Sequence, residues 1–256
     1  MTIIENIKIV LVEPAGERNI GSIARVMRNM GLKKLAIVNP ACDYLSEDAR
    51  IMAVHGVEVL ENAQICETVP EAIQECQKTI ATTARARDIP TALETPRDAT
   101  PWLLEDEYPS ALIFGPEDRG LSNQELSYAQ RFICIPSNPE YPSLNLAQAV
   151  GVCCYELYQN YHQSVSLNGD ATPQESQEKE KSNEVPLATI GQLEGYYQHL
   201  ESLLLKINYL QPHTANNKME KIRRIVNRGD LTAQELAMLR GMLRQTEWGL
   251  KNYDRL

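Results

Sequence analysis

Short runs of apolar, largely β-branched residues alternate along the first 160 residues with segments of helical spacing. Five such runs are predicted strands, at residues 7–12, 35–38, 78–83, 111–114 and 131–135. Helical spacing joins Ile20 to Met30, and Gly31 ends that helix. Ser46, Thr68 and Ser122 are predicted N-caps of further helices. This alternation predicts an α/β fold with a mostly parallel sheet and helices on both faces.

Residues 143–162 are predicted to form one long helix. The polar positions in it form a single narrow stripe, made of Asn145, Gln148, Glu156 and Gln159. A helix on the surface of a monomer shows an apolar stripe only about 100° wide. We therefore expect this helix to be covered on two sides, by its own sheet and by another subunit.

The pattern divides the chain into three parts. Residues 1–164 form the α/β domain, and residues 165–186 are a polar, net acidic stretch that is typical of a flexible linker. Residues 187–256 form a small helical extension with three helical patterns, at about 187–210, 216–228 and 232–254.

Charge narrows the choice of partners. The chain has 25 Lys and Arg against 34 Asp and Glu, a net charge of -9, which excludes binding to nucleic acid through bulk charge. A local basic patch is predicted within 216–228, where Lys221, Arg224 and Arg228 share one helix face and Ile222, Ile225 and Val226 are expected to pack inward. No apolar run is long enough for a membrane helix and no signal peptide is evident, so we expect a cytoplasmic protein that does not bind membranes.

Cysteine and histidine give little support for a metal site. The six cysteines include no C-x-x-C pair, and the four histidines are scattered. We expect buried free thiols and no bound metal.

Two pairs of glycines have the spacing found in phosphate-binding loops. Gly16 and Gly21 have G-x-x-x-x-G spacing, and Gly115 and Gly120 repeat it. A P-loop requires Lys directly after the second glycine, and neither pair has one. The dinucleotide fingerprint G-x-G-x-x-G is also absent, so nucleotide enzymes of these types are excluded.

Three polar, glycine- and proline-containing segments instead follow strands, at residues 13–25, 114–122 and 135–147. Ligands of open α/β sheets bind beyond the carboxyl ends of the strands. The segments contain the motifs N-x-G-x-x-x-R, F-G-x-E-x-x-G-L and I-P-x-N-P followed by S-L-N-L-A. In order and placement these motifs resemble the SPOUT-type RNA methyltransferases, in the branch that methylates ribose 2′-hydroxyls.

The resemblance implies a C-terminal trefoil knot in the α/β domain, a homodimer, and S-adenosylmethionine as the methyl donor. It also implies tRNA as the substrate, methylated on the ribose of a cytidine or uridine at position 32 of the anticodon loop. The residues that it assigns to the cofactor are Thr82, Thr83, Ala84, Gly115, Glu117, Ile135, Pro142, Ser143 and Leu144.

Arg25 is the catalytic residue that the resemblance implies, and Asn19, Arg85 and Arg87 are expected to contact RNA. The basic patch of Lys221, Arg224 and Arg228 in the helical extension is expected to contact tRNA as well. A guanidinium has no lone pair with which to accept a proton, so we expect Arg25 to stabilise negative charge on the 2′-oxygen. Glu117 either takes part in the proton's departure or only anchors its loop. Two alternative functions stay open: an RNA-binding dimer without catalysis, and a SPOUT enzyme that methylates a base.

Overall fold

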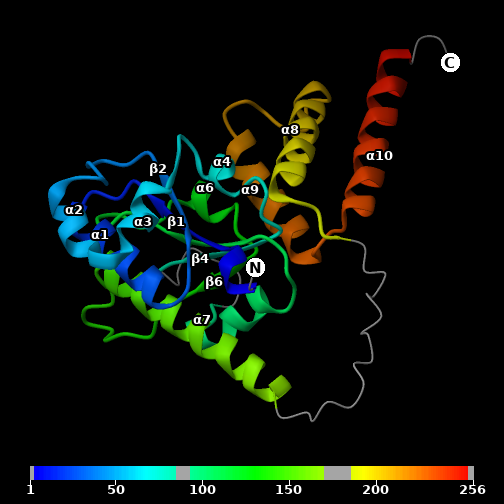
Figure 1. Ribbon diagram of the computed structural model, residues 1–256. Coiled ribbons are helices and arrows are strands. Elements are labelled where there is room, and N and C mark those ends of the chain that lie inside the picture. The colour runs from blue at the N-terminus through cyan, green and yellow to red at the C-terminus, as the bar shows by residue number, and fades with distance from the viewer. Residues whose placement is uncertain (1–2, 85–92, 170–185, 253–256) are drawn as a thin grey trace. The chain divides into compact units, whose positions relative to one another are not determined.

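The computed structural model describes residues 3–84, 93–169 and 186–252. The chain forms two compact units, Met1–Ser176 and Gln177–Leu256 (Figure 1). The boundary between them falls inside the predicted linker.

The first unit is built on a six-stranded sheet in which every pairing between neighbours is parallel. The strand order is β3-β2-β1-β5-β4-β6. The strands are β1 (Ile7–Val12), β2 (Lys34–Val38), β3 (Gln64–Cys66), β4 (Lys78–Thr82), β5 (Ser110–Phe114) and β6 (Arg131–Ile133). The five predicted strands and the parallel sheet are confirmed. The edge strand β3 was not predicted, because three residues of which two are exposed leave no apolar run.

The connecting helices begin at the predicted caps. The side chains of Ser46, Thr68 and Ser122 each accept a hydrogen bond from a backbone N–H three residues later. The helices of this unit are α1 (Glu17–Asn29), α2 (Glu47–Ala53), α3 (Val57–Glu61), α4 (Val69–Ile73), α5 (Pro96–Ala99), α6 (Asn123–Leu126) and α7 (Leu146–Gly169), with 3₁₀ turns η1 (Ile3–Asn6), η2 (Val54–Gly56) and η4 (Thr100–Leu104).

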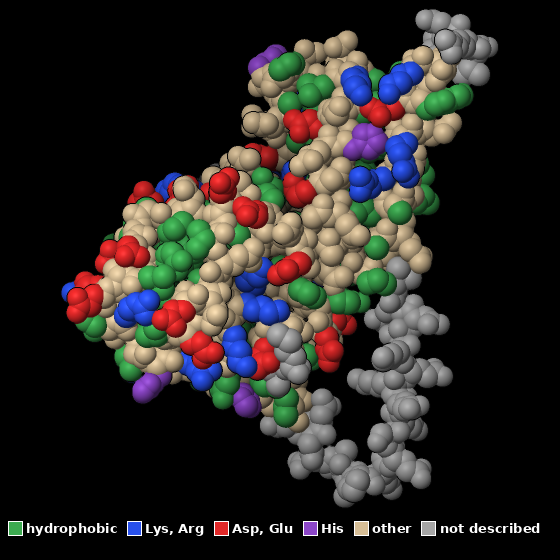
Figure 2. Space-filling view, turned by 45° about the horizontal axis from the view of Figure 1, so that its top comes forward, with side chains coloured by type: hydrophobic (Ala, Val, Ile, Leu, Met, Phe, Trp, Pro, Cys, Tyr) green, Lys and Arg blue, Asp and Glu red, His purple; other side chains and the backbone are tan. Residues whose placement is uncertain are grey.

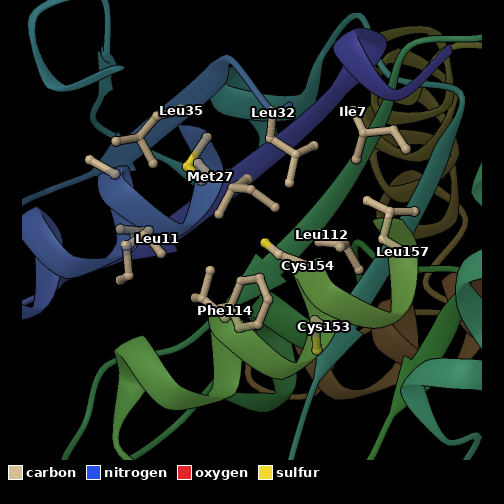
Figure 3. Close-up of a cluster of buried hydrophobic side chains, with 14 of the residues drawn as sticks. Ile7, Leu11, Met27, Leu32, Leu35, Leu112, Phe114, Cys153, Cys154 and Leu157 are labelled. Carbon is tan, nitrogen blue, oxygen red and sulfur yellow. The ribbon is translucent and has the colours of Figure 1, made fainter. Parts of the chain in front are cut away.

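Helices cover both faces of the sheet. Leu11 of β1 and Phe114 of β5 are buried on one face with Met27 of α1 and Leu157 of α7 (Figure 3). Lys8 points to the opposite face, where its Nζ donates to Ala72 O of α4 at 2.8 Å and pairs with Glu75 at 2.7 Å. The prediction that helices cover both faces of the sheet is therefore confirmed. The trefoil knot stays a prediction.

The first glycine pair has a packing role. A Cβ on Gly21 would lie 2.1 Å from Ala49 O, so α1 and α2 approach closely only because residue 21 has no side chain. Gly21 of this pair is thus explained by contact between two helices.

The long helix α7 begins at Leu146, so the predicted start at Ser143 is wrong. Asn145 Oδ1 accepts hydrogen bonds from the backbone N–H groups of Ala147 (2.9 Å) and Gln148 (3.4 Å) and so caps the helix. The helix continues to Gly169, so residues 165–169 are helical and the predicted linker begins too early. The helix buries Cys153 and Cys154 and leaves Val152 and Tyr155 exposed.

The second unit contains α8 (Ile190–Lys206), α9 (Ala215–Val226), the 3₁₀ turn η5 (Asn227–Gly229) and α10 (Ala233–Asn252). Its small core includes Tyr197 of α8, Met219 of α9 and Leu236 of α10. The three predicted helical patterns are confirmed, but the inward position of Ile225 is wrong, since its side chain is 69% exposed. Ile225 follows Met219 by six residues, which turns it about 240° around the helix, away from the core.

No helix in the described parts of the chain is long and apolar enough to span a bilayer.

Candidate functional site

A cavity of about 330 Å³ lies at the carboxyl ends of β4, β5 and β6. Three segments far apart in the sequence form its wall: the end of β4, residues 114–121 after β5, and residues 133–149. The wall contains all nine residues that the resemblance assigned to the cofactor, namely Thr82, Thr83, Ala84, Gly115, Glu117, Ile135, Pro142, Ser143 and Leu144. The end of β4 and the second and third motifs therefore meet at one place, where a ligand of an open α/β sheet is expected.

The glycines after β5 are required by the shape of their loop. A Cβ on Gly115 would lie 2.3 Å from Leu121 N and 2.5 Å from Gly120 C, because the two ends of the loop touch. Gly120 has φ +67°, which favours glycine. The second glycine pair thus closes a loop whose backbone lines the cavity.

Hydrogen bonds hold the end of β4 and the segment of residues 133–149 in place. Thr82 Oγ1 donates to Ile113 O at 3.1 Å, and Thr83 N donates to Ile133 O at 2.9 Å. Ser137 Oγ donates to Pro142 O at 2.9 Å and closes the segment before Ser143. These bonds give the cavity a wall that is largely preformed.

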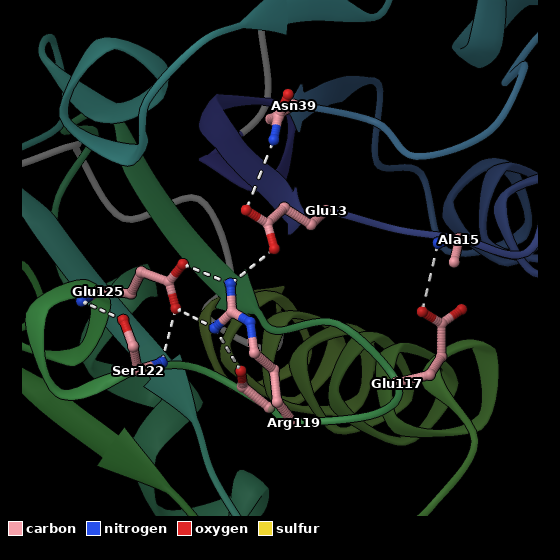
Figure 4. A network of polar contacts seen from close by, with 8 residues as sticks. Glu13, Ala15, Asn39, Glu117, Arg119, Ser122 and Glu125 are labelled. Atoms are coloured by element: carbon pink, nitrogen blue, oxygen red, sulfur yellow. Dashed lines mark hydrogen bonds and ion pairs between the residues drawn. The ribbon is translucent and has the colours of Figure 1, made fainter.

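Asn19 links all three motifs. Its Nδ2 donates to Glu117 Oε1 at 2.9 Å, and its Oδ1 accepts from Asn145 Nδ2 at 3.1 Å. The other carboxylate oxygen of Glu117 accepts from Ala15 N at 3.4 Å (Figure 4). Asn19 lies in the first turn of α1, which begins at Glu17, three residues before the helical spacing that was predicted from Ile20. Of the two readings of Glu117, loop anchoring is the one that these contacts support.

A second hollow of about 790 Å³ borders the cavity and shares Pro116, Glu117 and Asp118 with it. Glu13 and Asn39 also line it, at the ends of β1 and β2, and both have φ +46°. Sequence reasoning missed these two residues. The available signal was that each comes directly after a strand and directly before a proline.

Arg25 lies on α1 with an exposed side chain and lines neither hollow. That side chain makes no hydrogen bond or ion pair with any residue that the structure describes. The structure therefore does not bring Arg25 to the cavity wall, in contrast to the nine cofactor residues. Arg85 and Arg87 lie outside the described residues.

The predicted cations of the helical unit differ in availability. Lys221 and Arg228 are exposed, whereas Arg224 Nη2 lies 3.9 Å from Glu220. Arg223 pairs with Glu194 and lies 4.4 Å from the centre of the Tyr197 ring, so it serves the core of this unit.

Two of the buried thiols are kept protonated by their surroundings. Burial raises the pKa of Cys76 and that of Cys153 to about 12, which keeps both protonated. Within residues 3–84, 93–169 and 186–252, no group of three or more Cys, His, Asp or Glu is placed to hold a metal ion.

Comparison with known proteins agrees with this geometry. The SpoU rRNA Methylase family matches residues 6–155, and the C-terminal domain of the tRNA methyltransferase TrmJ matches residues 191–255. The tRNA (cytidine/uridine-2′-O-)-methyltransferase TrmJ of Klebsiella pneumoniae is 38% identical over 95% of this chain and 97% of its own length. The tRNA (cytidine/uridine/adenosine-2′-O-)-methyltransferase TrmJ of Pseudomonas aeruginosa is also 38% identical, over 95% of each chain.

The crystal structure of TrmJ from Z. mobilis ZM4 superposes with a TM-score of 0.79 at 32% identity, covering 94% of this chain and 98% of that one. Both units are therefore shared with these relatives. The chain belongs to the SpoU methylase family, in the TrmJ group whose members carry the additional C-terminal domain.

Proposed function

We propose that this protein transfers a methyl group from S-adenosylmethionine to the ribose 2′-hydroxyl of a cytidine or uridine in tRNA, at position 32 of the anticodon loop. The observation that carries the proposal is the convergence of the nine cofactor residues, which come from three segments far apart in the sequence, on one cavity at the strand ends. The relatives named above, which match nearly the whole chain, support the choice of substrate.

The cavity fits a cofactor of this kind. Its volume of about 330 Å³ lies in the range of small-molecule sites. Gly115 and Leu144 line the cavity and would present backbone groups to an adenine, while Ile135 supplies an apolar wall. When bound, S-adenosylmethionine supplies an electrophilic methyl group on a sulfonium that is already a good leaving group.

Arg25 acts on the other reactant. The neutral 2′-hydroxyl is a weak nucleophile, so the site must stabilise the negative charge that develops on its oxygen. The Arg25 side chain has no partner in the described parts of the chain and is free to meet an RNA ribose or phosphate. Since Glu117 is engaged by Asn19 and Ala15, we assign the departing proton to water or to an RNA phosphate.

We also propose a homodimer in which α7 lies at the interface. Leu146 and Ala149 of this helix line the cavity, and Val152 and Tyr155, which follow within two turns, are 38% and 48% exposed. An apolar surface next to the cofactor cavity is suited to a second copy of the chain.

The helical unit is proposed to bind tRNA through cations that have no partner among the residues described in the structure. Arg240, Arg244 and Lys251 of α10 share a stripe with Trp248, which is 53% exposed. Blue side chains gather on this unit beside its C-terminal end (Figure 2). The three cations of α10, together with Lys221 and Arg228, supply local positive charge in a chain of net charge -9. An exposed Trp among cations is suited to stack on an unpaired base.

The test is incubation of tRNA transcripts with the protein and S-adenosylmethionine, followed by digestion and mass spectrometry of the nucleosides. We expect 2′-O-methylcytidine or 2′-O-methyluridine, and its loss when the ribose at position 32 is replaced by deoxyribose. A base-methylated nucleoside would support the base-methylating alternative. Absence of S-adenosylmethionine binding in calorimetry would support an RNA-binding dimer without catalysis. Because one relative's name includes adenosine, transcripts with adenosine at position 32 belong in the same series.

A further inference from the structure

Arg119 is the most highly connected side chain in the loop that follows β5. Its Nη1 donates to Gly120 O at 3.0 Å and to Glu125 Oε2 at 2.9 Å, and its Nη2 donates to Glu125 Oε1 at 3.0 Å and to Glu13 Oε2 at 2.7 Å (Figure 4). One guanidinium therefore joins its own loop, the end of β1 and the first turn of α6.

The two carboxylates are themselves fixed. Glu125 also accepts from Ser122 N at 2.6 Å, as part of the capping box of α6. Glu13 N donates to Val38 O at 2.8 Å, which ties it to the end of β2. Although burial of Glu125 opposes ionisation, hydrogen bonds from Arg119 and Ser122 hold its pKa below the usual range. Arg119 thus lies between two carboxylates, one anchored to α6 and the other to the end of β2.

Glu13 also has an unusual backbone. Its φ of +46° lies in the left-handed region, which a residue with a side chain rarely adopts. Such conformations persist where the surroundings determine them, and they are concentrated at functional sites. Here the conformation accompanies a Glu13 carboxylate that meets Arg119.

The loop that Arg119 holds forms part of the cavity wall. Residues 115–121 lie between β5 and α6 and fold back on themselves, with Gly120 N donating to Pro116 O at 2.9 Å. Their backbone lines the cavity, and Glu117 in the same loop meets Asn19. A shift of this loop would therefore change the cofactor wall and the Asn19 contact together.

We propose that Arg119 is a positioning residue: clamped by Glu13 and Glu125, it holds residues 115–121 in the shape that binds the cofactor. The inference rests on the proposed function and adds to it a residue that none of the sequence motifs had singled out. A planar guanidinium can bridge two carboxylates at once, which an ammonium of similar reach does not reproduce.

The test compares Arg119→Ala and Arg119→Lys with Arg50→Ala as the matched control. Arg50 also bonds a carbonyl and a carboxylate, Leu45 O at 3.0 Å and Glu61 at 2.8 Å, but does not line the cavity. We expect Arg119→Ala to weaken binding of S-adenosylhomocysteine about tenfold or more in calorimetry and to lower kcat. Arg119→Lys should recover little of either, and Arg50→Ala should match the wild type in both.

A double-mutant cycle separates positioning from general stability. If Glu13 acts through Arg119, Glu13→Gln combined with Arg119→Ala weakens cofactor binding little more than Arg119→Ala alone. Glu13→Gln keeps the shape of the side chain, so it also tests the clamp if Arg119→Ala does not fold. Wild-type affinity and kcat in a folded Arg119→Ala or in Glu13→Gln would overturn the inference. A wild-type protein that binds no cofactor would instead overturn the proposed function.

Discussion

Asn145 Nδ2 donates a hydrogen bond to Asn19 Oδ1 over 3.1 Å, although 126 residues of sequence separate the two. Asn19 also donates a hydrogen bond to Glu117, so the first turn of α1 contacts both the loop after β5 and the segment before α7. The same Asn145 caps α7 through its Oδ1. One amide pair thus couples the start of the long helix to the arrangement of the site.

Arg25→Ala should lower the rate of methyl transfer by about 10²–10³, because it removes a contact to the developing negative charge. Affinity for S-adenosylmethionine should stay unchanged, since Arg25 does not line the cavity. Arg25→Lys should rescue poorly, because Lys lacks the planar fork. Single-turnover assays with Arg28→Ala, an exposed arginine on the same helix, provide the control. Near wild-type turnover in Arg25→Ala would contradict the role.

Val152→Glu should convert the protein to monomers or make it insoluble, because it places a charge in the proposed α7 interface. Val165→Glu serves as the control, since Val165 is also an exposed valine of α7 but lies more than three turns further along. Light scattering after gel filtration measures the mass. A soluble, active dimer of Val152→Glu would show that this face of α7 is not in the dimer interface.

Replacing Lys221, Arg224 and Arg228 together by Ala should weaken tRNA binding and reduce the slope of log affinity against log salt. Each lost phosphate contact contributes roughly 0.7–0.9 to that slope, so the expected reduction is about two. Trp248→Ala should weaken binding with little change in slope, since stacking releases no counterions. Filter binding between 50 and 200 mM salt, roughly the range over which such slopes are resolved, distinguishes these outcomes. An unaltered affinity and slope in the triple variant would move RNA binding to other surfaces.

Glu125→Gln should destabilise the protein near neutral pH and progressively less in acid. The folded pKa of Glu125 lies below its unfolded value of about 4.3, because hydrogen bonds from Arg119 and Ser122 outweigh the effect of burial. Its stabilising contribution is therefore complete above that pH and is lost as pH falls through the folded pKa. Thermal melts of both proteins from neutral pH into acid measure the difference in Tm. A difference that does not shrink in acid would show that ionised Glu125 is not the source.

Gly21→Ala should cost about 1–3 kcal/mol of stability or more, because the added Cβ would overlap Ala49 O at 2.1 Å. Gly241→Ala is the matched control. It lies within α10 with nothing near the position of the added Cβ, so it should stabilise by roughly 0.5–1 kcal/mol through helix propensity. Urea unfolding followed by circular dichroism measures both. Equal effects of the two substitutions would show that the contact between α1 and α2 yields easily.

The sequence by itself determined the features that arise from neighbours along the chain. Apolar runs gave five of the six strands, and Ser46, Thr68 and Ser122 marked the helix starts, because capping depends on residues three positions apart. The cofactor residues could also be predicted, since they lie in short contiguous segments at the carboxyl ends of strands. Parallel strands place those ends at one edge of the sheet, so the motifs meet there.

Only the tertiary structure decided which side chains act on distant partners. The burial of Met219 in place of Ile225 and the clamp of Arg119 on Glu13 leave no local pattern. Arg119 and Glu13 are 106 residues apart, and a lone arginine in a glycine loop reads in sequence as solvent-exposed. Periodicity reports which face of a helix is apolar, whereas the packing of the other elements determines which face is covered.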